Sequence, residues 1–505
     1  MPHLVFMSLL VHQCTPQLVQ KRSNQMQKSK TNFPDLSALI PVMPEPGKRS
    51  RALYTAIRRL IETGQLPAGA KLPTTRDLAR RLGLSRGAAV DAYEVLIAEG
   101  FAEARVGAGT FVAAEVPQLK ADVPEIVDDG ADYSGPPHPC TLGIAIADER
   151  TRRVFRQLLH RRLERPQPNF YSYGDPRGEH ELRQAIADYA RVARGVRCHP
   201  GQVVVTSGIR HGLDLVMRAA LHPGDAVWVE DPCYLSAQAT ITGVGLRTVP
   251  VPVDREGIDV AAGEVIGGKA KAVYCTPSHQ FPLGVTLTMR RRLALIDWAK
   301  RNDAWIFEDD YDSEFRFSGP PLASIQGMDD AGRVIYLGSF SKVLFPGLRI
   351  GYAILPEPLV EPVLAQRQQM DRQPPSLPQG AIADLLNEGH FAAHLRRVRK
   401  RAEACRDALV DGLGAGGNSF SVAAPEQGLH LIVSLADEFD DEKLVTAAAE
   451  AGIGALPLST HYLAAPIRKG LVLGYSGFEP EDLRRAGKKL AGIVHDLSPA
   501  TADGP

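Results

Sequence analysis

The sequence has few cysteines and no excess of either charge. Its six cysteines are scattered without a C-x-x-C pair, so the sequence predicts neither a zinc site of that kind nor a disulfide framework. Lys and Arg number 58, and so do Asp and Glu, so any affinity for nucleic acid must come from a local excess of positive charge. No metal site is expected, and a reducing cytoplasm suits the free thiols.

Long apolar runs are also missing. Leu4–Val11 is apolar but too short to span a bilayer, and no basic segment precedes it, which argues against a signal peptide and a membrane anchor. A polar stretch follows, and we expect residues 1–46 to form a disordered tail; the true start codon stays open. The chain has 505 residues, 44% of them hydrophobic, which indicates several globular domains with a large buried core.

Three helical segments and a small hairpin are predicted for residues 47–115. Apolar residues recur there with the period of a helix, Thr74 or Thr75 can cap the second helix, and Ser85 can cap the third. We expect Ile97 on the inward side of the third helix. Two helices joined by a short turn and followed by a hairpin are the parts of a winged helix-turn-helix, which places its second helix in the major groove of DNA.

Positive charge gathers in the same region. Residues 48–113 contain 11 Lys and Arg against 6 Asp and Glu, an excess of +5 in a chain without net charge. Local asymmetry of this kind is what DNA binding needs. The sequence L-P-T-T-R-D-L-A at 72–79 and G-A-G-T-F-V at 107–112 resemble a GntR-type DNA-binding domain.

This resemblance implies that Arg76 and Arg86 contact DNA and that the glycine-rich wing lies along its backbone. Arginine suits bidentate contacts to phosphate or guanine. The predicted DNA-binding set is Thr75, Arg76, Ser85, Arg86, Gly107, Gly109 and Thr110.

The rest of the chain reads as one large domain. Residues 116–138 are rich in Pro, Asp and Gly and are predicted to form a linker. From 139 to 498, short apolar runs alternate with helical segments, the pattern of an α/β domain, and 499–505 are expected to form a tail.

One lysine lies between small hydroxyls and an arginine. Lys342 follows an apolar run at 334–337 that reads as a buried strand, and burial favours the neutral, nucleophilic amine. Ser339 and Ser341 can donate to a phosphate, and Arg349 adds a charged fork for the same group. The pattern S-x-S-K with Arg seven residues later resembles the lysine motif of fold-type I enzymes that use pyridoxal 5'-phosphate (PLP), which implies that Lys342 forms the Schiff base with PLP.

A strand followed by a glycine turn and a helix predicts a second part of the phosphate site. The unpaired amides at a helix N-terminus bind phosphate. The predicted phosphate cup therefore comprises Ser207, Gly208, Ile209 and Arg210.

Further segments resemble those of fold-type I aminotransferases around the cofactor ring. The resemblance implies that Tyr234 stacks on the ring, that Asp309 keeps the ring nitrogen protonated, and that Tyr311 bonds the ring oxygen. Phe281 stands where these enzymes have an asparagine that bonds the ring hydroxyl. Either His279 or Gln280 takes over this contact, or it is lost.

The segment Y-S-Y-G-D-P-R-G at 171–178 resembles the loop whose tyrosine reaches the phosphate of the partner subunit. Tyr171 or Tyr173 can take this role, and we assign it to Tyr173.

The motifs E-D-D-Y-D-S-E-F at 308–315 and S-H-Q at 278–280 resemble the MocR family of regulators. That resemblance implies a GntR-type winged helix-turn-helix fused to a fold-type I aminotransferase-like domain, with a mostly parallel sheet between helices and a small C-terminal α+β subdomain. It also implies PLP as cofactor, a double-stranded DNA operator, and a head-to-tail homodimer in the cytoplasm, with no membrane partner.

The residue at the position that binds the substrate carboxylate in aminotransferases helps to distinguish a regulator from an enzyme. Val472 stands where aminotransferases usually place an arginine clamp, and Arg468 is a displaced substitute. We therefore expect a PLP-dependent transcription regulator that senses an amine or PLP itself. An active aminotransferase is the alternative, and PLP carriage without DNA recognition is a third possibility.

Overall fold

The computed structural model describes residues 49–115, 135–144, 146–166, 170–319, 322–414, 419–464 and 466–498. The chain divides into two compact units, Met1–Asp132 and Tyr133–Pro505. The predicted tails at 1–46 and 499–505 and most of the predicted linker lie outside the described residues, so these domain limits stay predictions. Among the helices that the structure describes, none has both the length and the apolar character needed to cross a membrane.

The N-terminal unit is a small winged helix-turn-helix. Its elements are α2 (Arg49–Glu62), α3 (Thr75–Leu82), α4 (Arg86–Ala98), β1 (Ala102–Arg105) and β2 (Gly109–Val112). The hydroxyl of Thr74 accepts the first-turn N–H of Asp77 in α3 at 3.1 Å, and Ser85 caps α4 in the same way at 3.2 Å. Leu53 and Leu96 are fully buried between the helices, whereas Ile97 is 37% exposed, so the expectation that Ile97 points inward is wrong.

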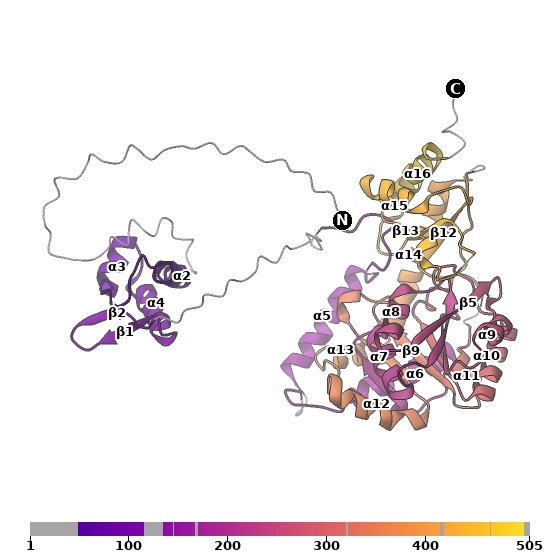
Figure 1. The fold of residues 1–505 in the computed structure, drawn as a ribbon, viewed down its shortest axis with the longest axis horizontal. Coiled ribbons are helices and arrows are strands. Elements are labelled where there is room, and N and C mark those ends of the chain that lie inside the picture. The colour runs from indigo at the N-terminus through magenta and orange to yellow at the C-terminus, as the bar shows by residue number, and fades with distance from the viewer. Residues whose placement is uncertain are drawn as a thin grey trace, which may run out of the picture. The chain divides into compact units, whose positions relative to one another are not determined.

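The second unit is built on one large sheet (Figure 1). Its strands follow the order β3-β10-β9-β8-β7-β4-β5-β6. β10 and β6 run opposite to the other six strands, so the sheet is mostly parallel, as the sequence predicts. The strands are β3 (Val203–Thr206), β4 (Ala226–Asp231), β5 (Arg247–Asp254), β6 (Gly257–Ile258), β7 (Ala272–Cys275), β8 (Trp305–Asp310), β9 (Val334–Ser339) and β10 (Gly351–Ile354).

Helices cover both faces of this sheet. Successive side chains of a strand point to opposite faces, so each strand contributes apolar side chains to both helix layers. In β4, Val227 and Val229 pack in the core that contains α7, α8 and α12, whereas Trp228 points to the opposite face and stacks on Trp298 of α10 at 4.0 Å between ring centroids. The helices are α5 (Glu149–Glu164), α6 (His180–Arg194), α7 (Ile209–Ala220), α8 (Leu235–Gly243), α9 (Val260–Gly267), α10 (Met289–Asn302), α11 (Ile325–Met328), α12 (Glu357–Met370) and α13 (Gln379–Asn387), with short 3₁₀ turns η1 (Pro200–Gln202) and η2 (Pro346–Leu348).

A small α+β subdomain completes the unit. Its four-stranded antiparallel sheet has the order β11-β12-β14-β13 and packs against α14 to α16 around Leu409, Leu471 and Leu490. The elements are α14 (His390–Leu413), β11 (Phe420–Val422), β12 (His430–Leu435), α15 (Asp441–Glu450), β13 (Leu456–Pro457), η3 (Ser459–His461), β14 (Gly470–Gly474) and α16 (Pro480–Asp496). The fold class that the sequence predicts is confirmed.

The segment at 138–144 lies against this subdomain. The carbonyl of Pro139 accepts the N–H of Gly454 at 2.7 Å, and that of Cys140 accepts the N–H of Gly474 at 2.9 Å. A Cβ at Gly454 would lie 2.3 Å from the hydroxyl of Thr141, so glycine is required for this close approach. The segment is thereby held in place where it leads into the cavity described next.

Candidate functional site

A cavity of about 330 Å³ opens where the parallel strands end. Strands β7, β8 and β9 each bring a lining residue to it from their carboxyl ends, the usual ligand position in an open α/β sheet. The lining residues are Leu142, Gly143, Gly208, Ile209, Arg210, Tyr234, Tyr274, Thr276, Phe281, Asp309, Tyr311, Ser339, Ser341, Lys342, Pro346, Arg349, Leu429 and His430.

Lys342 presents its amine to this cavity. Burial lowers the pKa of the Lys342 ammonium below its ordinary value, while the carboxylates of Asp312 and Asp309 act in the opposite direction. A larger share of the neutral amine, which is the nucleophile, is therefore present than at an exposed lysine. A Cβ at Gly143 would lie 2.8 Å from Lys342 Nζ, so this glycine keeps space open beside the amine.

The phosphate end of the cavity is formed by the start of α7 and by Arg349. Gly208 is the N-cap of α7 and has no side chain to occupy the first amides of the helix. Arg349 Nη2 donates to the carbonyl of Ser207 at 2.8 Å, and a Cβ at Gly208 would lie 3.2 Å from the same nitrogen. Of the predicted phosphate cup, Gly208, Ile209 and Arg210 line the cavity, whereas Ser207 is not a lining residue.

Two buried oxygens at the cavity lack hydrogen-bond partners among the described residues: Ser341 Oγ and Asp309 Oδ1. The other oxygen of Asp309 accepts the hydroxyl of Tyr274 at 2.6 Å, and burial raises the pKa of Asp309 to about 7. A buried polar atom without a partner is uncommon in a folded protein. A phosphate beside Ser341 and a pyridine nitrogen beside Asp309 would satisfy both atoms, so the residues present fit PLP.

Tyr311 is held by His279. Its hydroxyl donates to the carbonyl of His279 at 2.9 Å and lies 3.1 Å from His279 Nδ1. That nitrogen donates to Asp312 Oδ2 at 2.9 Å, because a carboxylate can only accept. His279 therefore does not line the cavity itself but contacts Tyr311, which does.

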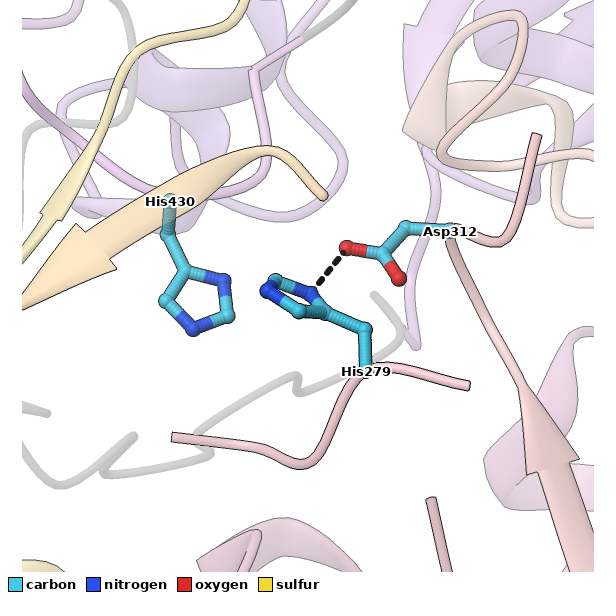
Figure 2. A group of neighbouring side chains, drawn as sticks. All are labelled: His279, Asp312 and His430. Carbon is cyan, nitrogen blue, oxygen red and sulfur yellow. Dashed lines mark hydrogen bonds and ion pairs between the residues drawn. The ribbon is translucent and has the colours of Figure 1, made fainter. Parts of the chain in front are cut away.

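A second imidazole lies beside this pair. Figure 2 shows the ring of His279 between Asp312 and His430. The three residues offer ligand atoms within 4.8 Å of one another, but His279 Nδ1 is already bonded to Asp312. We therefore interpret the group as a histidine–carboxylate pair next to His430, and the absence of a metal site stays a prediction. His430 Nε2 donates to the carbonyl of Pro282 at 2.9 Å, and burial lowers the pKa of His430 well below its ordinary value.

The remaining predicted cofactor residues lie in different surroundings. Tyr234 lines the cavity, with its ring edge-to-face against Phe281 at 5.5 Å. Gln280 Nε2 donates to the carbonyls of Pro232 at 2.8 Å and Phe281 at 2.7 Å, and Gln280 does not line the cavity. Tyr173 is 71% exposed and does not line the cavity, and the Arg372 guanidinium lies 3.7 Å from its ring centroid.

Several lining residues were given no role by the sequence. Leu142 and Gly143 follow the linker without a recognisable pattern. Leu429 and His430, from the small subdomain, belong to the segment Q-G-L-H at 427–430, which resembles the MocR family but suggested no place at the site. The resemblance to fold-type I enzymes brought the predicted cofactor residues together, but it did not indicate that these four residues join them.

The predicted DNA-binding residues form two groups in the N-terminal unit. Thr75 and Arg76 begin α3, and Ser85 and Arg86 stand at the start of α4, the second helix of the helix-turn-helix. Arg76, Ser85 and Arg86 are exposed. The other group is the wing, where Gly107 and Gly109 have positive φ angles of 74° and 106°, and the carbonyl of Thr110 accepts the N–H of Leu72 at 2.8 Å.

Comparisons with known proteins agree with both units. Residues 49–112 match the gntR family of bacterial regulatory proteins, and residues 147–486 match the aminotransferase class I and II family. The probable rhizopine catabolism regulatory protein MocR of Rhizobium meliloti is 36% identical over 458 residues, which cover 86% of this chain and 91% of MocR. The chain belongs to the MocR family.

Other relatives of this MocR-family chain include regulators and enzymes. The pyridoxine biosynthesis regulator PdxR of Corynebacterium glutamicum is 32% identical and matches over 87% of this chain and 94% of its own length. Among solved structures, an archaeal alanine:glyoxylate aminotransferase superposes with a TM-score of 0.67 at 27% identity, covering 72% of this chain and 92% of the enzyme. The kynurenine aminotransferase of Pyrococcus horikoshii in complex with PMP superposes with a TM-score of 0.65, also at 27% identity, and the match covers 72% of this chain and 92% of the enzyme.

The MocR-family chain is thus a PLP-dependent DNA-binding transcription regulator. PLP supplies an aldehyde that condenses with primary amines and a pyridine ring that withdraws electrons. The N-terminal unit supplies DNA binding, as the gntR family match indicates. Which individual residues hold PLP and DNA stays a prediction.

Proposed function

We propose that this MocR-family regulator is ligand-responsive: an amine, or PLP itself, bound at the Lys342 cavity changes its affinity for a double-stranded DNA operator. Lys342 provides the amine for PLP, Arg349 and the start of α7 hold the phosphate, and Asp309 and Tyr311 hold the ring. A ligand can shift a protein between two arrangements only if it binds one of them better. We propose that the ligand binds the DNA-binding arrangement and the non-binding arrangement of this regulator with different affinities.

One observation supports this proposal: the described lining residues include the groups that fit the cofactor, but none of them is an arginine at the position of the substrate-carboxylate clamp. Val472, at the usual clamp position, is fully buried in β14 and does not line the cavity. Arg468 is exposed and is not a lining residue either. Since a bidentate clamp contributes much of the positioning for catalysis, sensing is favoured over efficient turnover of amino acids.

The aminotransferase alternative has support of its own. Lys342 and Asp309 occupy one cavity, and both groups are needed for amine chemistry on PLP. An enzyme of this kind would turn over an amino donor and a 2-oxo acid many times per protein molecule.

We further propose a head-to-tail homodimer acting in the cytoplasm, where its operator is. Tyr171 and Tyr173, two positions apart, are 81% and 71% exposed, and neighbouring exposed aromatic side chains suit an interaction surface. In a homodimer of this kind Tyr173 reaches the phosphate site of the partner. Light scattering of the purified protein gives the mass of the assembly, and a monomer at micromolar concentration would contradict the proposal.

The deciding experiment is a gel shift on the DNA upstream of the protein's own coding region, with competitor DNA, with and without PLP. The parent is compared with Lys342→Ala and with Lys300→Ala, an exposed lysine of α10 outside the cavity. We expect specific binding that PLP or an amine changes in the parent and in Lys300→Ala but not in Lys342→Ala. Ligand-independent operator binding by all three proteins, together with multiple turnovers in a transaminase assay, would refute the sensing role and favour the enzyme.

A further inference from the structure

Part of the Lys342 cavity is not needed to hold PLP. Once the residues proposed for the phosphate, the ring and the Schiff base are set aside, the wall that remains is mostly apolar. It consists of Leu142, Gly143, Tyr274, Thr276, Phe281, Pro346, Leu429 and His430. An effector bound together with the cofactor contacts this wall.

The cations of the described lining are already committed. Besides Lys342, they are Arg210 and Arg349. Arg210 stands in the first turn of α7, and Arg349 contacts the carbonyl of Ser207, so both lie at the phosphate end. A PLP phosphate carries close to two negative charges, which the Arg349 guanidinium and the amides at the start of α7 would offset, and Arg210 is an exposed residue at the same end.

The polar groups of the remaining wall do not attract an anion. The hydroxyl of Thr276 donates to Glu230 at 2.7 Å, and that of Tyr274 donates to Asp309 at 2.6 Å. His430 donates its Nε2 proton to Pro282, and its buried ring is neutral, so it supplies no positive charge. A carboxylate placed against these described wall residues would lose its water and find neither a guanidinium nor a charged imidazole among them, which is costly.

We propose that the effector is a small primary amine that carries no carboxylate group, with an alkyl or hydroxylated body. The inference rests on the proposed ligand-responsive function, which it narrows to one class of ligand. The apolar side chains of Leu142, Phe281 and Leu429 suit an alkyl body, and a hydroxyl can be desolvated at far lower cost than a carboxylate.

The test uses the full-length protein loaded with PLP and pairs of amines that differ at one group. Suitable pairs are 4-amino-1-butanol with 4-aminobutanoate, and 2-amino-1,3-propanediol with serine. The concentration for half-saturation is read from the visible absorbance of the loaded protein, and the effect on operator binding from a gel shift. We expect the carboxylate-free member of each pair to half-saturate at a concentration lower by about tenfold or more.

A variant tests the reason for the preference. His430→Arg adds a cation to the wall and is expected to narrow or reverse the difference within each pair; circular dichroism checks its fold. If that variant does not fold, the comparison on the parent protein still decides. Equal or tighter binding of the carboxylates to the parent overturns this inference and leaves the regulator proposal intact. If the absorbance responds to the amines but operator binding responds to no ligand, the ligand-responsive function fails while the amine preference stands.

Discussion

Replacing Arg349 with glutamine separates the phosphate contact from the rest of the site. The guanidinium lies beside Ser207 and Gly208, next to the unpaired amides of α7. Arg349 has a positive φ of 52°, and glutamine has the same unbranched Cβ, so the turn is not altered while the charge is removed. The change therefore isolates one charged contact to the phosphate.

The expected magnitude follows from that contact. A hydrogen bond to a charged group contributes about 1.5–3 kcal/mol, and the exposure of Arg349 before binding favours the lower half of that range. At about 1.4 kcal/mol per factor of ten, Arg349→Gln should raise the Kd for PLP by roughly tenfold to fortyfold. Binding of pyridoxal, which has the aldehyde and the ring but no phosphate, should not change.

The assay is a titration of cofactor-free protein with PLP and separately with pyridoxal, followed by visible absorbance. Arg255→Gln, at an exposed position in the turn between β5 and β6, is the matched control and should bind both compounds like the parent. If Arg349→Gln weakens the binding of PLP and of pyridoxal equally, or leaves both affinities unchanged, the assignment of Arg349 to the phosphate is refuted.

Three further predictions address the ring, its support and the DNA-binding unit. Because burial raises the pKa of Asp309 from 3.8 to about 7, the folded cofactor-free protein keeps a proton that the unfolded chain loses as the pH rises between these values. The free energy of unfolding falls across that window. Asp309→Asn should remove the part of this fall in the free energy of unfolding that Asp309 causes, and should therefore raise the Tm at pH 8 in calorimetry. The same change should weaken PLP binding. A variant whose Tm depends on pH like that of the parent would contradict the prediction. His279→Asn should raise the pH midpoint of the absorbance of PLP-loaded protein by about one unit, because the anion of the ring oxygen loses stabilisation, and we expect Tyr311→Phe to do the same. Additive shifts in the double variant would show that His279 does not act through Tyr311. Arg86→Ala should weaken operator binding and reduce the slope of log K against log salt by about one if Arg86 contacts a phosphate, and an unchanged slope would exclude that contact.

Features determined by neighbouring residues in the sequence were predictable. The cap of α4 at Ser85 and the strand that ends before Lys342 depend on residues a few positions away, and the structure has both. The GntR and aminotransferase segments likewise indicated the family and the fold, which the comparisons confirm.

Features decided by distant residues were not predictable. The sequence could not choose between His279 and Gln280, because their surroundings depend on Asp312, which is 33 positions from His279, and on Pro232, which is 48 positions from Gln280. Ile97 fits the helical pattern and lies near the end of α4, yet it is 37% exposed although Leu96 beside it is fully buried. In each case burial and tertiary contacts override the local pattern.

The bonds that hold residues 138–144 against Gly454 and Gly474 affect how the second unit can be isolated. The aminotransferase match begins at residue 147, but Leu142 and Gly143 form part of the cavity wall. A fragment cut at 147 would leave the side of Lys342 open to water, and a cofactor affinity measured on it would describe a damaged cavity. A fragment that retains the native pocket has to start before Pro139, inside the segment predicted as linker.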